Sequence, residues 1–300
     1  MYVVLGATGH TGSIIGNFLL SKGEKVRVVG REPSRLERFV RKGAEAFPAN
    51  VNDAGALTKA FSGARAAYLM LPPSMTSLDY RADQDRESDA IAKAVKDSGL
   101  HYAVQLSSYG AHVPAGTGPI AGVHTFEEKL DAINGLNVLH LRPGYFMENN
   151  LMAVGMIRDM GMFGHALLPD LKLPMIATHD IGDYAAGRLL NLDFSGRQIR
   201  ELLGQRDLSI TEATAIIARG IGKPDLRYVQ FPYDQVQQVL MQMGIPVKTA
   251  AQFIEMYEAI NAGIVVGQEP RSPENTTPTS FEKFVSDVFA PAYQGKAATA

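Results

Sequence analysis

Three glycines near the N-terminus constrain this chain more than any other feature of its sequence. They occur as Gly6-Ala-Thr-Gly9-His-Thr-Gly12, between an apolar run at residues 2–5 and an amphipathic run that predicts a helix over residues 12–22. In this context the first glycine permits a tight turn, the second lets the backbone approach a pyrophosphate, and the third lets helix and strand pack closely. The N–H groups that open the helix then bind the negative charge. The pattern predicts a dinucleotide-binding loop made of Gly6, Thr8, Gly9, His10, Thr11 and Gly12.

The same loop has two other interpretations. A phosphate loop for nucleotide hydrolysis is excluded, because that motif needs a lysine directly before Ser13 and this chain has Gly12 there. The second interpretation, a glycine turn that binds no ligand, is not excluded by the sequence.

Strand-like and helix-like segments alternate over the first 145 residues. The early strands are nearly continuous apolar runs, as expected when helices cover both faces of a sheet. Such alternation indicates βαβ units and a parallel sheet, so we expect an α/β fold with a doubly wound, Rossmann-type sheet. The predicted strands are residues 2–5, 25–29, 44–49, 66–71, 102–106 and 137–141, and the predicted helices are residues 12–22, 33–42, 55–61, 82–98 and 126–133.

The alternation of strands and helices does not continue through the second half of the chain. A dinucleotide-binding domain is expected over residues 1–150, completed by residues 176–206, which hold a helix at 179–190 and a strand at 198–203. Residues 207–290 predict a smaller, mostly helical lobe over the carboxyl ends of the strands, for a substrate or a partner. Its helices are expected at 211–219, 233–243 and 249–262, with a polar loop at 267–279 and a disordered tail at 291–300.

Composition excludes several classes of function. Lys plus Arg is 29 and Asp plus Glu is 31, so the net charge of −2 does not favour binding to nucleic acid. The absence of cysteine excludes disulfides, thiolate metal sites and cysteine nucleophiles, and no two of the seven histidines have helical metal-ligand spacing. No apolar run approaches 18 residues and no signal-peptide pattern is present, so we expect a cytoplasmic protein without a membrane segment or a bound metal.

Charged residues after the second predicted strand bear on the choice of cofactor. A carboxylate near this position favours the 2′-hydroxyl of NAD, whereas arginine accommodates the 2′-phosphate of NADP. Arg31 lies about where that residue belongs and Arg35 follows one helical turn later, which favours NADP(H). Glu32 keeps NAD(H) possible, because a shift of one residue would place its carboxylate there. Alternatively, both arginines only solvate the start of a helix.

Several motifs together resemble a known family. The sequences GATGHTG, VVGREPSRL, Leu71-Pro72-Pro73, and HTFEEKL followed by LRPGYFMENN are similar to those of the NmrA-like group of atypical short-chain dehydrogenases. The glycine loop is common to many dehydrogenases, whereas Lys129 followed by the run from Arg142 to Asn149 is much more specific. The resemblance covers residues 2–206 and continues more weakly to 290. The group includes NADP-dependent quinone reductases, and also nitrogen-regulator redox sensors that bind cofactor without a known reaction.

The resemblance implies further cofactor contacts at the carboxyl ends of the strands. Asn50 and Val51 would lie beside the adenine, and Lys129 would bind the nicotinamide ribose. Leu71, Pro72 and Pro73 would line the ribose and nicotinamide end, although a rigid turn is the alternative for this run. Ser107 and Ser108 end the fifth strand, and Tyr145 is expected to pack under the cofactor.

The proton donor is less clearly indicated. Short-chain dehydrogenases usually place a tyrosine four residues before the lysine, and here that position is Thr125, a poor general acid. Tyr109 and His124 are the candidate substitutes and join Lys129 as candidate catalytic residues, although His124 equally suits a helix cap. Conjugated acceptors such as quinones make fewer demands, because water can supply the proton after hydride transfer.

Two functions follow as hypotheses. The first is an NADP(H)-dependent oxidoreductase that reduces a quinone-like or other small conjugated substrate. The second is a non-catalytic NAD(P)-binding redox sensor whose lobe binds a protein partner. Other reactions on the same fold, including isomerase and epimerase chemistry, complete the alternatives.

Overall fold

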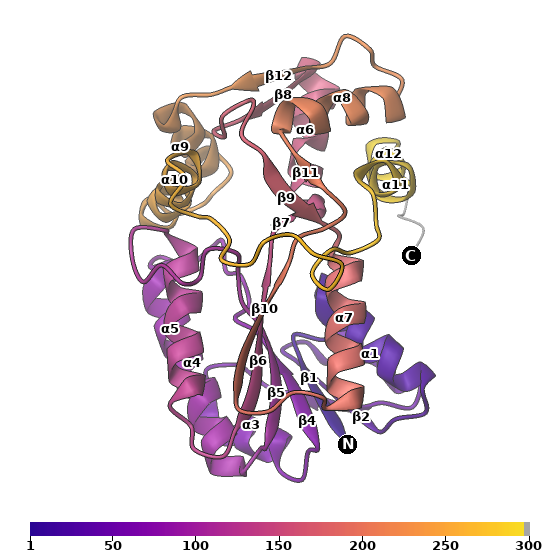
Figure 1. Cartoon of the computed structure of the whole chain (residues 1–300), viewed down its shortest axis with the longest axis vertical. Coiled ribbons are helices and arrows are strands. Elements are labelled where there is room, and N and C mark those ends of the chain that lie inside the picture. The colour runs from indigo at the N-terminus through magenta and orange to yellow at the C-terminus, as the bar shows by residue number, and fades with distance from the viewer. Residues whose placement is uncertain (297–300) are drawn as a thin grey trace.

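Seven parallel strands form the central sheet of the computed structural model, which describes residues 1–296 (Figure 1). Their order across the sheet is β10-β6-β5-β4-β1-β2-β3, which confirms the expected Rossmann-type α/β fold. The strand predicted at residues 198–203 is β10 and completes the sheet beside β6. The strands are β1 (Tyr2–Leu5), β2 (Val26–Gly30), β3 (Glu45–Pro48), β4 (Ala66–Leu69), β5 (Tyr102–Leu106), β6 (Asn137–Pro143) and β10 (Arg197–Leu202).

Helices cover both faces of this sheet and form a separate apolar core on each. On one face, Ile15, Phe39 and Ile181 join the same buried cluster, which places α1, α2 and α7 together. On the other face, Phe61 and Ile91 belong to a second cluster with residues of α5. The helices are α1 (His10–Ser21), α2 (Pro33–Val40) and α7 (Thr178–Asn191) on the first face, and α3 (Ala54–Phe61), α4 (Tyr80–Ser98) and α5 (Pro119–Asp131) on the second.

The strand order reverses between β1 and β4. The chain builds outward from β1 through β2 to β3, then returns to β4 on the other side of β1. Loops that leave the carboxyl ends of β1 and β4 therefore run in opposite directions and leave a crevice, where open α/β sheets bind their ligands.

A second lobe lies beyond the carboxyl ends of the strands, at the top of Figure 1. Its apolar core draws on residues 147–177 as well as on residues 208–289, so the lobe includes a segment before the one expected. Residues 207–290 are mostly helical, as expected, and the lobe as a whole also contains five short strands in two small sheets; strands of two to four residues are too short to show an alternating pattern. Its elements are β7 (Tyr145–Phe146), a 3₁₀ helix (Met147–Ala153), α6 (Val154–Met160), β8 (Met162–His165), β9 (Leu173–Ile176), β11 (Asp207–Leu208), α8 (Ile210–Gly220), β12 (Arg227–Gln230), α9 (Tyr233–Gln242), α10 (Val247–Asn261), α11 (Phe281–Phe284), a π-helix (Val285–Phe289) and α12 (Ala290–Tyr293).

The ends of two predicted segments need correction. A disordered tail was expected from residue 291, but α12 continues to Tyr293, and residues 297–300 lie outside the described residues. Helix α5 was expected from residue 126 and begins at Pro119, because Gly118 (φ 55°) turns the chain and proline suits the first helical position. Within residues 1–296 no helix is long and apolar enough to cross a membrane.

Helix α1 can approach β1 only because position 12 has no side chain. A Cβ atom on Gly12 would lie 2.3 Å from the carbonyl oxygen of Gly6, so a Gly12→Ala substitution requires backbone movement. We expect it to lower the free energy of unfolding by about 1–3 kcal/mol, measured by chemical denaturation. Gly187 in α7 is the control, because its Cβ would meet no atom within 4 Å; Gly187→Ala should stabilise by about 0.5–1 kcal/mol. Equal effects of the two substitutions would contradict this account of the packing.

Candidate functional site

A pocket of about 250 Å³ opens where β1, β2 and β4 end. Its wall combines glycine-loop backbone, two arginines and several apolar side chains. The lining residues that the sequence predicted are Gly6, Thr8, Gly9, Arg31, Arg35, Val51, Pro72 and Pro73, and those it missed are Leu5, Val29, Gly30, Ala49 and Met70. The missed residues are the strand ends themselves and their neighbours, which the apolar strand runs could have identified.

The glycine loop presents unused hydrogen-bond donors to this pocket. Gly6 adopts φ 66°, which makes the tight turn, and Gly9 precedes α1 as an N-cap with no side-chain bond to the helix. Among the described residues, the N–H groups of His10, Thr11 and Gly12 have no hydrogen-bond acceptor. By contrast, Asp53 and Asp79 cap α3 and α4 with their carboxylates. Helix α1 therefore keeps the N–H groups and the partial positive charge that bind an anion.

The backbone at Gly9 leaves space in front of these donors. A Cβ there would meet only the carbonyl oxygen of Gly6, at 3.4 Å, and its φ of −82° is ordinary for any residue. The glycine is therefore not required by the local fold. A pyrophosphate approaching the backbone is a physical reason for it.

Arg31 and Arg35 bring the positive charge of the pocket. Both side chains are exposed, and within residues 1–296 neither makes a hydrogen bond or an ion pair. By contrast Arg27, on the neighbouring strand β2, binds Glu45 at 3.0 Å. The pocket therefore offers two sets of donors to an anion. One is the N–H groups at the start of α1, and the other is the guanidinium groups of Arg31 and Arg35.

Several predicted cofactor residues do not line this pocket. The hydroxyl of Thr11 is buried against the phenol of Tyr68 at 2.8 Å, so its side chain faces the sheet and only its backbone N–H faces the loop. The Asn50 side chain accepts the N–H of Asn52 at 3.0 Å and stabilises its own turn. The pocket lining omits His10, Gly12 and Leu71, and Met70 takes the place expected for Leu71.

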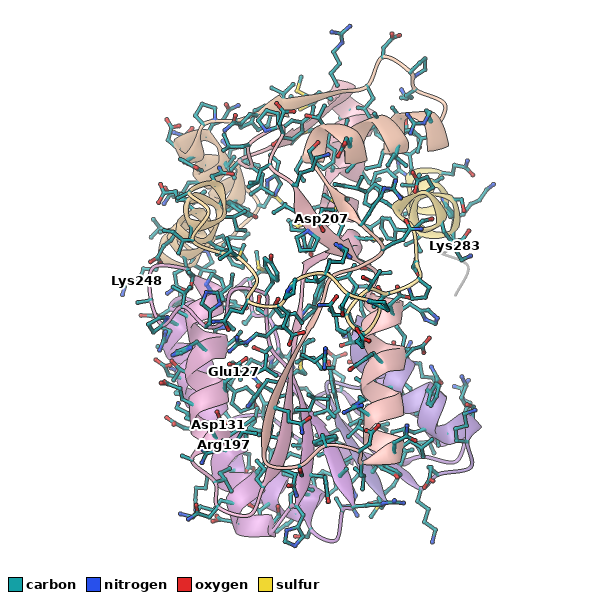
Figure 2. All side chains as sticks on the ribbon, in the orientation of Figure 1. Glu127, Asp131, Arg197, Asp207, Lys248 and Lys283 are labelled. Atoms are coloured by element: carbon teal, nitrogen blue, oxygen red, sulfur yellow. The ribbon has the colours of Figure 1, made fainter. Side chains whose placement is uncertain are left out.

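A buried charge pair lies at the ends of the neighbouring strands β5 and β6. Arg142 donates two hydrogen bonds to Glu127, at 3.0 and 2.6 Å, and both side chains are almost fully buried. Ser107, at the end of β5, donates its hydroxyl to the same carboxylate. Figure 2 marks Glu127 on α5, one turn before Asp131. No motif in the sequence singles out Glu127, and its partner Arg142 stands out only as part of the family motif. Ser108, next along the chain, donates to the carbonyl of Tyr109 at 3.2 Å.

Lys129, expected at the nicotinamide ribose, is engaged by α4 in the structure, and its role at the cofactor stays a prediction. Its ammonium binds the carboxylate of Asp89 at 2.6 Å and the hydroxyl of Ser88 at 2.8 Å, both on α4. Because α5 begins at Pro119, Lys129 lies ten residues along the helix, about 15 Å from its start at the ligand-binding edge. The shorter helix predicted from residue 126 would have put this lysine in the first turn. Thr125 is likewise held by α4, through a 2.8 Å hydrogen bond from Arg81.

Three side chains expected near the cofactor do not line the pocket. They are the candidate proton donors Tyr109 and His124, and Tyr145. His124 binds the carbonyl of Ala111 through Nδ1 at 2.7 Å, so its ring stabilises the loop that follows β5. Burial raises the pKa of Tyr145, whose phenol lies near those of Tyr257 and Tyr228 in the lobe. Burial also raises the pKa of Tyr109, despite a hydrogen bond with the backbone of Gly267. Raised phenol pKa values make both tyrosines weak acids, and their roles stay predictions.

A C-terminal strap, residues 265–280, connects the lobe to this edge of the sheet (Figure 1). The fully buried carboxylate of Glu201, on β10, accepts the N–H groups of Gln268 and Glu269 at 2.9 and 3.0 Å. Gln268 also accepts a 2.9 Å hydrogen bond from Arg142. The strap therefore fixes the lobe to the ends of β6 and β10.

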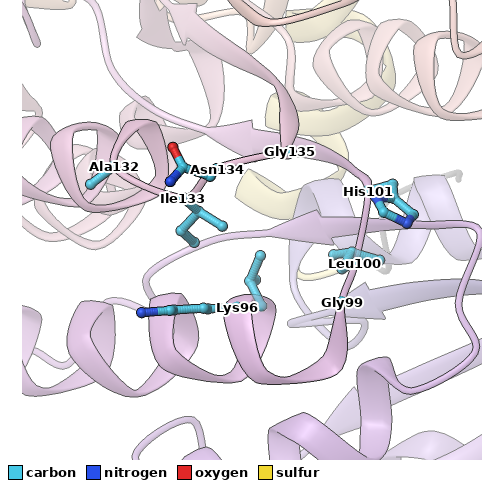
Figure 3. A pocket seen from close by; sticks show the side chains of 9 residues that line it. Lys96, Gly99, Leu100, His101, Ala132, Ile133, Asn134 and Gly135 are labelled. Atoms are coloured by element: carbon cyan, nitrogen blue, oxygen red, sulfur yellow. The ribbon is translucent and has the colours of Figure 1, made fainter.

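A second hollow lies at the opposite edge of the sheet, where α4 and α5 end (Figure 3). Its volume is about 170 Å³, and Lys96, His101 and Asn134 are among the residues that line it. It contains none of the predicted site residues. In the part of the chain that the structure describes, no group of three or more His, Asp or Glu side chains could hold a metal ion.

Comparisons with known proteins agree with this fold. A model of the NmrA-like family matches residues 2–284. An NAD(P)H azoreductase from Xenophilus azovorans is 25% identical over 259 residues, covering 86% of this chain and 86% of that protein. Quinone oxidoreductase 2 from Escherichia coli (strain K12) is 27% identical over 252 residues, covering 82% and 83%. The solved structure of Citrobacter sp. triphenylmethane reductase complexed with NADP(H) has a TM-score of 0.77 at 17% identity, covering 95% of this chain and 99% of that one, a likeness of fold.

Removal of Glu127 should strongly destabilise the protein. A Glu127→Ala variant leaves the Arg142 guanidinium buried without its carboxylate, so we expect the free energy of unfolding to fall by about 3–5 kcal/mol. The neighbouring Glu128, with an exposed side chain, is the matched control, and Glu128→Ala should change stability by less than about 0.5 kcal/mol. Chemical denaturation of both variants tests this difference, and similar losses in the two would refute the importance of the buried pair.

Proposed function

Because the chain belongs to the NmrA-like family, we propose that it is an NADP(H)-dependent reductase of a quinone-like or other small conjugated acceptor. One observation carries the proposal: the uncapped start of α1 and two unpaired arginines face the same pocket. This pairing suits a molecule with a pyrophosphate and a second phosphate, because each anionic group has its own donors. NADP(H) has both groups.

The residues of the pocket suit the adenine, the 2′-phosphate and the pyrophosphate of such a cofactor. The N–H groups of α1 would bind the pyrophosphate past Gly9, and Arg31 with Arg35 would bind the 2′-phosphate. Ala49 and Val51 offer an apolar wall to the adenine, while Pro72 and Pro73 extend the pocket from the end of β4. The bound cofactor would supply the hydride.

The chain itself offers little acid–base chemistry at this edge. Thr125 is held by Arg81, and the pKa of Tyr109 is raised. A substrate that needs a strong enzymic acid is therefore poorly served. An electron-poor conjugated acceptor fits better, since the protein then has only to orient the reactants and exclude competing reactions. The azoreductase and quinone oxidoreductase relatives support the same class of acceptor.

The fixed groups at β5 and β6 would hold the reacting end of the site. Ser107 is oriented by its hydrogen bond to Glu127, and Arg142 locks that carboxylate. The strap then ties the lobe above to Arg142 through Gln268. A rigid wall of this kind would hold the substrate and the cofactor in a fixed relative orientation. Such positioning can supply a large part of an enzyme's rate acceleration.

Consumption of NADPH against a panel of quinones, azo dyes and triphenylmethane dyes tests the proposal. We expect steady turnover with at least one class, and none in a variant that cannot bind the dinucleotide. Tight NADPH binding without turnover across the panel would contradict the reductase and favour the sensor hypothesis, in which the lobe binds a protein partner.

Arg31 should determine the preference for NADPH over NADH. Arg31→Ala removes a charge-assisted bond to the 2′-phosphate, so NADPH affinity should fall roughly ten- to a hundred-fold while NADH affinity changes little. Isothermal titration calorimetry measures both. The control is Arg41→Ala, which removes an equal charge from an exposed side chain just after α2. Equal affinities for NADPH and NADH in the unmutated protein would overturn the assignment.

Gly9→Val should abolish dinucleotide binding without unfolding the protein. The valine side chain would stand where the pyrophosphate approaches, yet the backbone at this position is unstrained and no other side chain lies within 4 Å. Circular dichroism and thermal melting check the fold, and calorimetry checks binding. Unchanged affinity in a folded variant would mean that the glycine turn is only structural.

A further inference from the structure

Two half-buried side chains of the lobe have polar atoms without a partner. His165, the last residue of β8, accepts the N–H of Leu167 at 3.2 Å through Nδ1, so its ring proton is on Nε2. The ring of Tyr257, on α10, lies 4.7 Å from the His165 ring in an edge-to-face contact. Within residues 1–296, neither His165 Nε2 nor the Tyr257 hydroxyl makes a hydrogen bond. Both atoms reach the accessible surface, unlike fully buried unpartnered atoms such as Thr117 Oγ1.

Both groups are neutral donors near pH 7. Burial lowers the pKa of His165 to about 4 and raises the pKa of Tyr257 to about 12. The imidazole therefore offers one N–H and the phenol one O–H, and neither carries a charge. Tyr145, Tyr228 and Tyr257 all pack against the same apolar core of the lobe. A few polar groups in an apolar frame are typical of a site that orients a small molecule.

The loop that carries His165 is held in place from two sides. The phenol of Tyr228 donates to the carbonyls of His165 and Leu167, at 3.0 and 2.6 Å. The amide of Asn261, at the end of α10, donates to the carbonyl of Ala166 at 2.9 Å. Because α10 also carries the tyrosine that faces His165, these bonds fix the two donors relative to each other. Donors that are fixed before binding lose little conformational freedom when a ligand arrives.

Helix α10 lies above the start of α5 and contacts loops that leave the ends of β4 and β5 (Figure 1). The hydroxyl of Thr249 donates at 2.6 Å to the carbonyl of Ser77, in the loop that leaves β4 past the two prolines of the cofactor pocket. The backbone of Gln252 packs on Gly118, after β5, so closely that a Cβ there would lie 2.0 Å from the Gln252 carbonyl oxygen. Tyr257 follows eight residues after Thr249, about 12 Å along the helix. The donor pair therefore lies in the part of the lobe that covers the ligand-binding edge.

We propose that His165 and Tyr257 bind the acceptor, and that they select a planar acceptor with a carbonyl oxygen, such as a quinone, over a cationic dye. This inference rests on the proposed function, in which the bound cofactor supplies a hydride. Two neutral donors match the lone pairs of a carbonyl oxygen, and the aromatic rings offer apolar contact to a planar molecule. A cationic dye without such an oxygen would leave both donors unpaired.

The same donors would assist the reaction. Hydride transfer moves two electrons from NADPH to the quinone, which leaves NADP⁺ and a negative charge on a quinone oxygen that water then protonates. Donors already directed at that oxygen bind it more strongly as its charge grows. Their removal should therefore lower kcat more than it raises KM.

Tyr257→Phe removes one donor and keeps the ring contact with His165. With saturating NADPH and p-benzoquinone, we expect kcat/KM to fall roughly ten- to a hundred-fold, mostly through kcat. Tyr102→Phe is the matched control, because Tyr102 also has an edge-to-face ring contact, at 5.7 Å with Phe194, but begins β5 at the opposite end of the sheet. Its kinetics should match those of the unmutated protein, and circular dichroism checks that both variants fold.

Two variants of His165 separate the donor from the support of the loop. Asparagine can accept the Leu167 N–H in place of Nδ1 but has no donor at the position of Nε2, whereas glutamine extends an amide N–H to about that position. We expect His165→Asn to lose quinone reduction about as Tyr257→Phe does, and His165→Gln to keep more of it.

Binding without turnover gives a second measurement. Calorimetry of p-benzoquinone binding in the presence of NADP⁺, which has no hydride to give, should show affinity roughly two- to ten-fold weaker in Tyr257→Phe, with NADP⁺ affinity unchanged. Unchanged quinone kinetics and affinity in Tyr257→Phe and His165→Asn would overturn the inference. So would reduction of a cationic triphenylmethane dye by the unmutated protein at least as fast as that of the quinone. If NADPH binds tightly but no acceptor is reduced, the proposed function fails and the inference falls with it.

Discussion

The close contact between Gly12 and Gly6 is the constraint on which the site depends. With no side chain at position 12, α1 can begin directly above the end of β1, and its first N–H groups then point into the crevice beside β4. A Cβ at this position would push the helix away from the strand and move those donors. The close contact of α1 with β1 therefore also places the N–H groups that would bind an anion.

Charge is distributed unevenly along the ligand-binding edge. At the β2 end the arginines are exposed and unpaired, as suits groups that exchange water for a phosphate. At the β5 and β6 end the arginine is buried and bonded twice to one carboxylate. The first arrangement binds an anion, and the second fixes geometry, because an unpaired charge buried there would cost several kcal/mol.

The lobe is tied to the sheet by backbone groups rather than by apolar contact alone. Glu201 accepts two N–H groups of the strap, and Arg271 donates to the carbonyls of Leu203 and Gly204. Two of these bonds use the backbone of the strap and two use its Arg271 side chain, and together they fix the strap over the ends of β6 and β10.

The sequence by itself determined the sheet, the glycine loop and the candidate phosphate ligands, because strand periodicity and glycine spacing are local properties of the chain. Only the tertiary structure decided where side chains from distant segments meet. The contacts of Lys129 with α4 are an example, since its position depends on where α5 begins, and that start is set by Gly118 and Pro119 ten residues earlier. The Glu127–Arg142 pair joins a helix to a strand, and Glu201 on β10 meets Gln268 of the strap across 67 residues of sequence. Such contacts between distant segments are set by tertiary packing, and they leave no periodic pattern in the sequence.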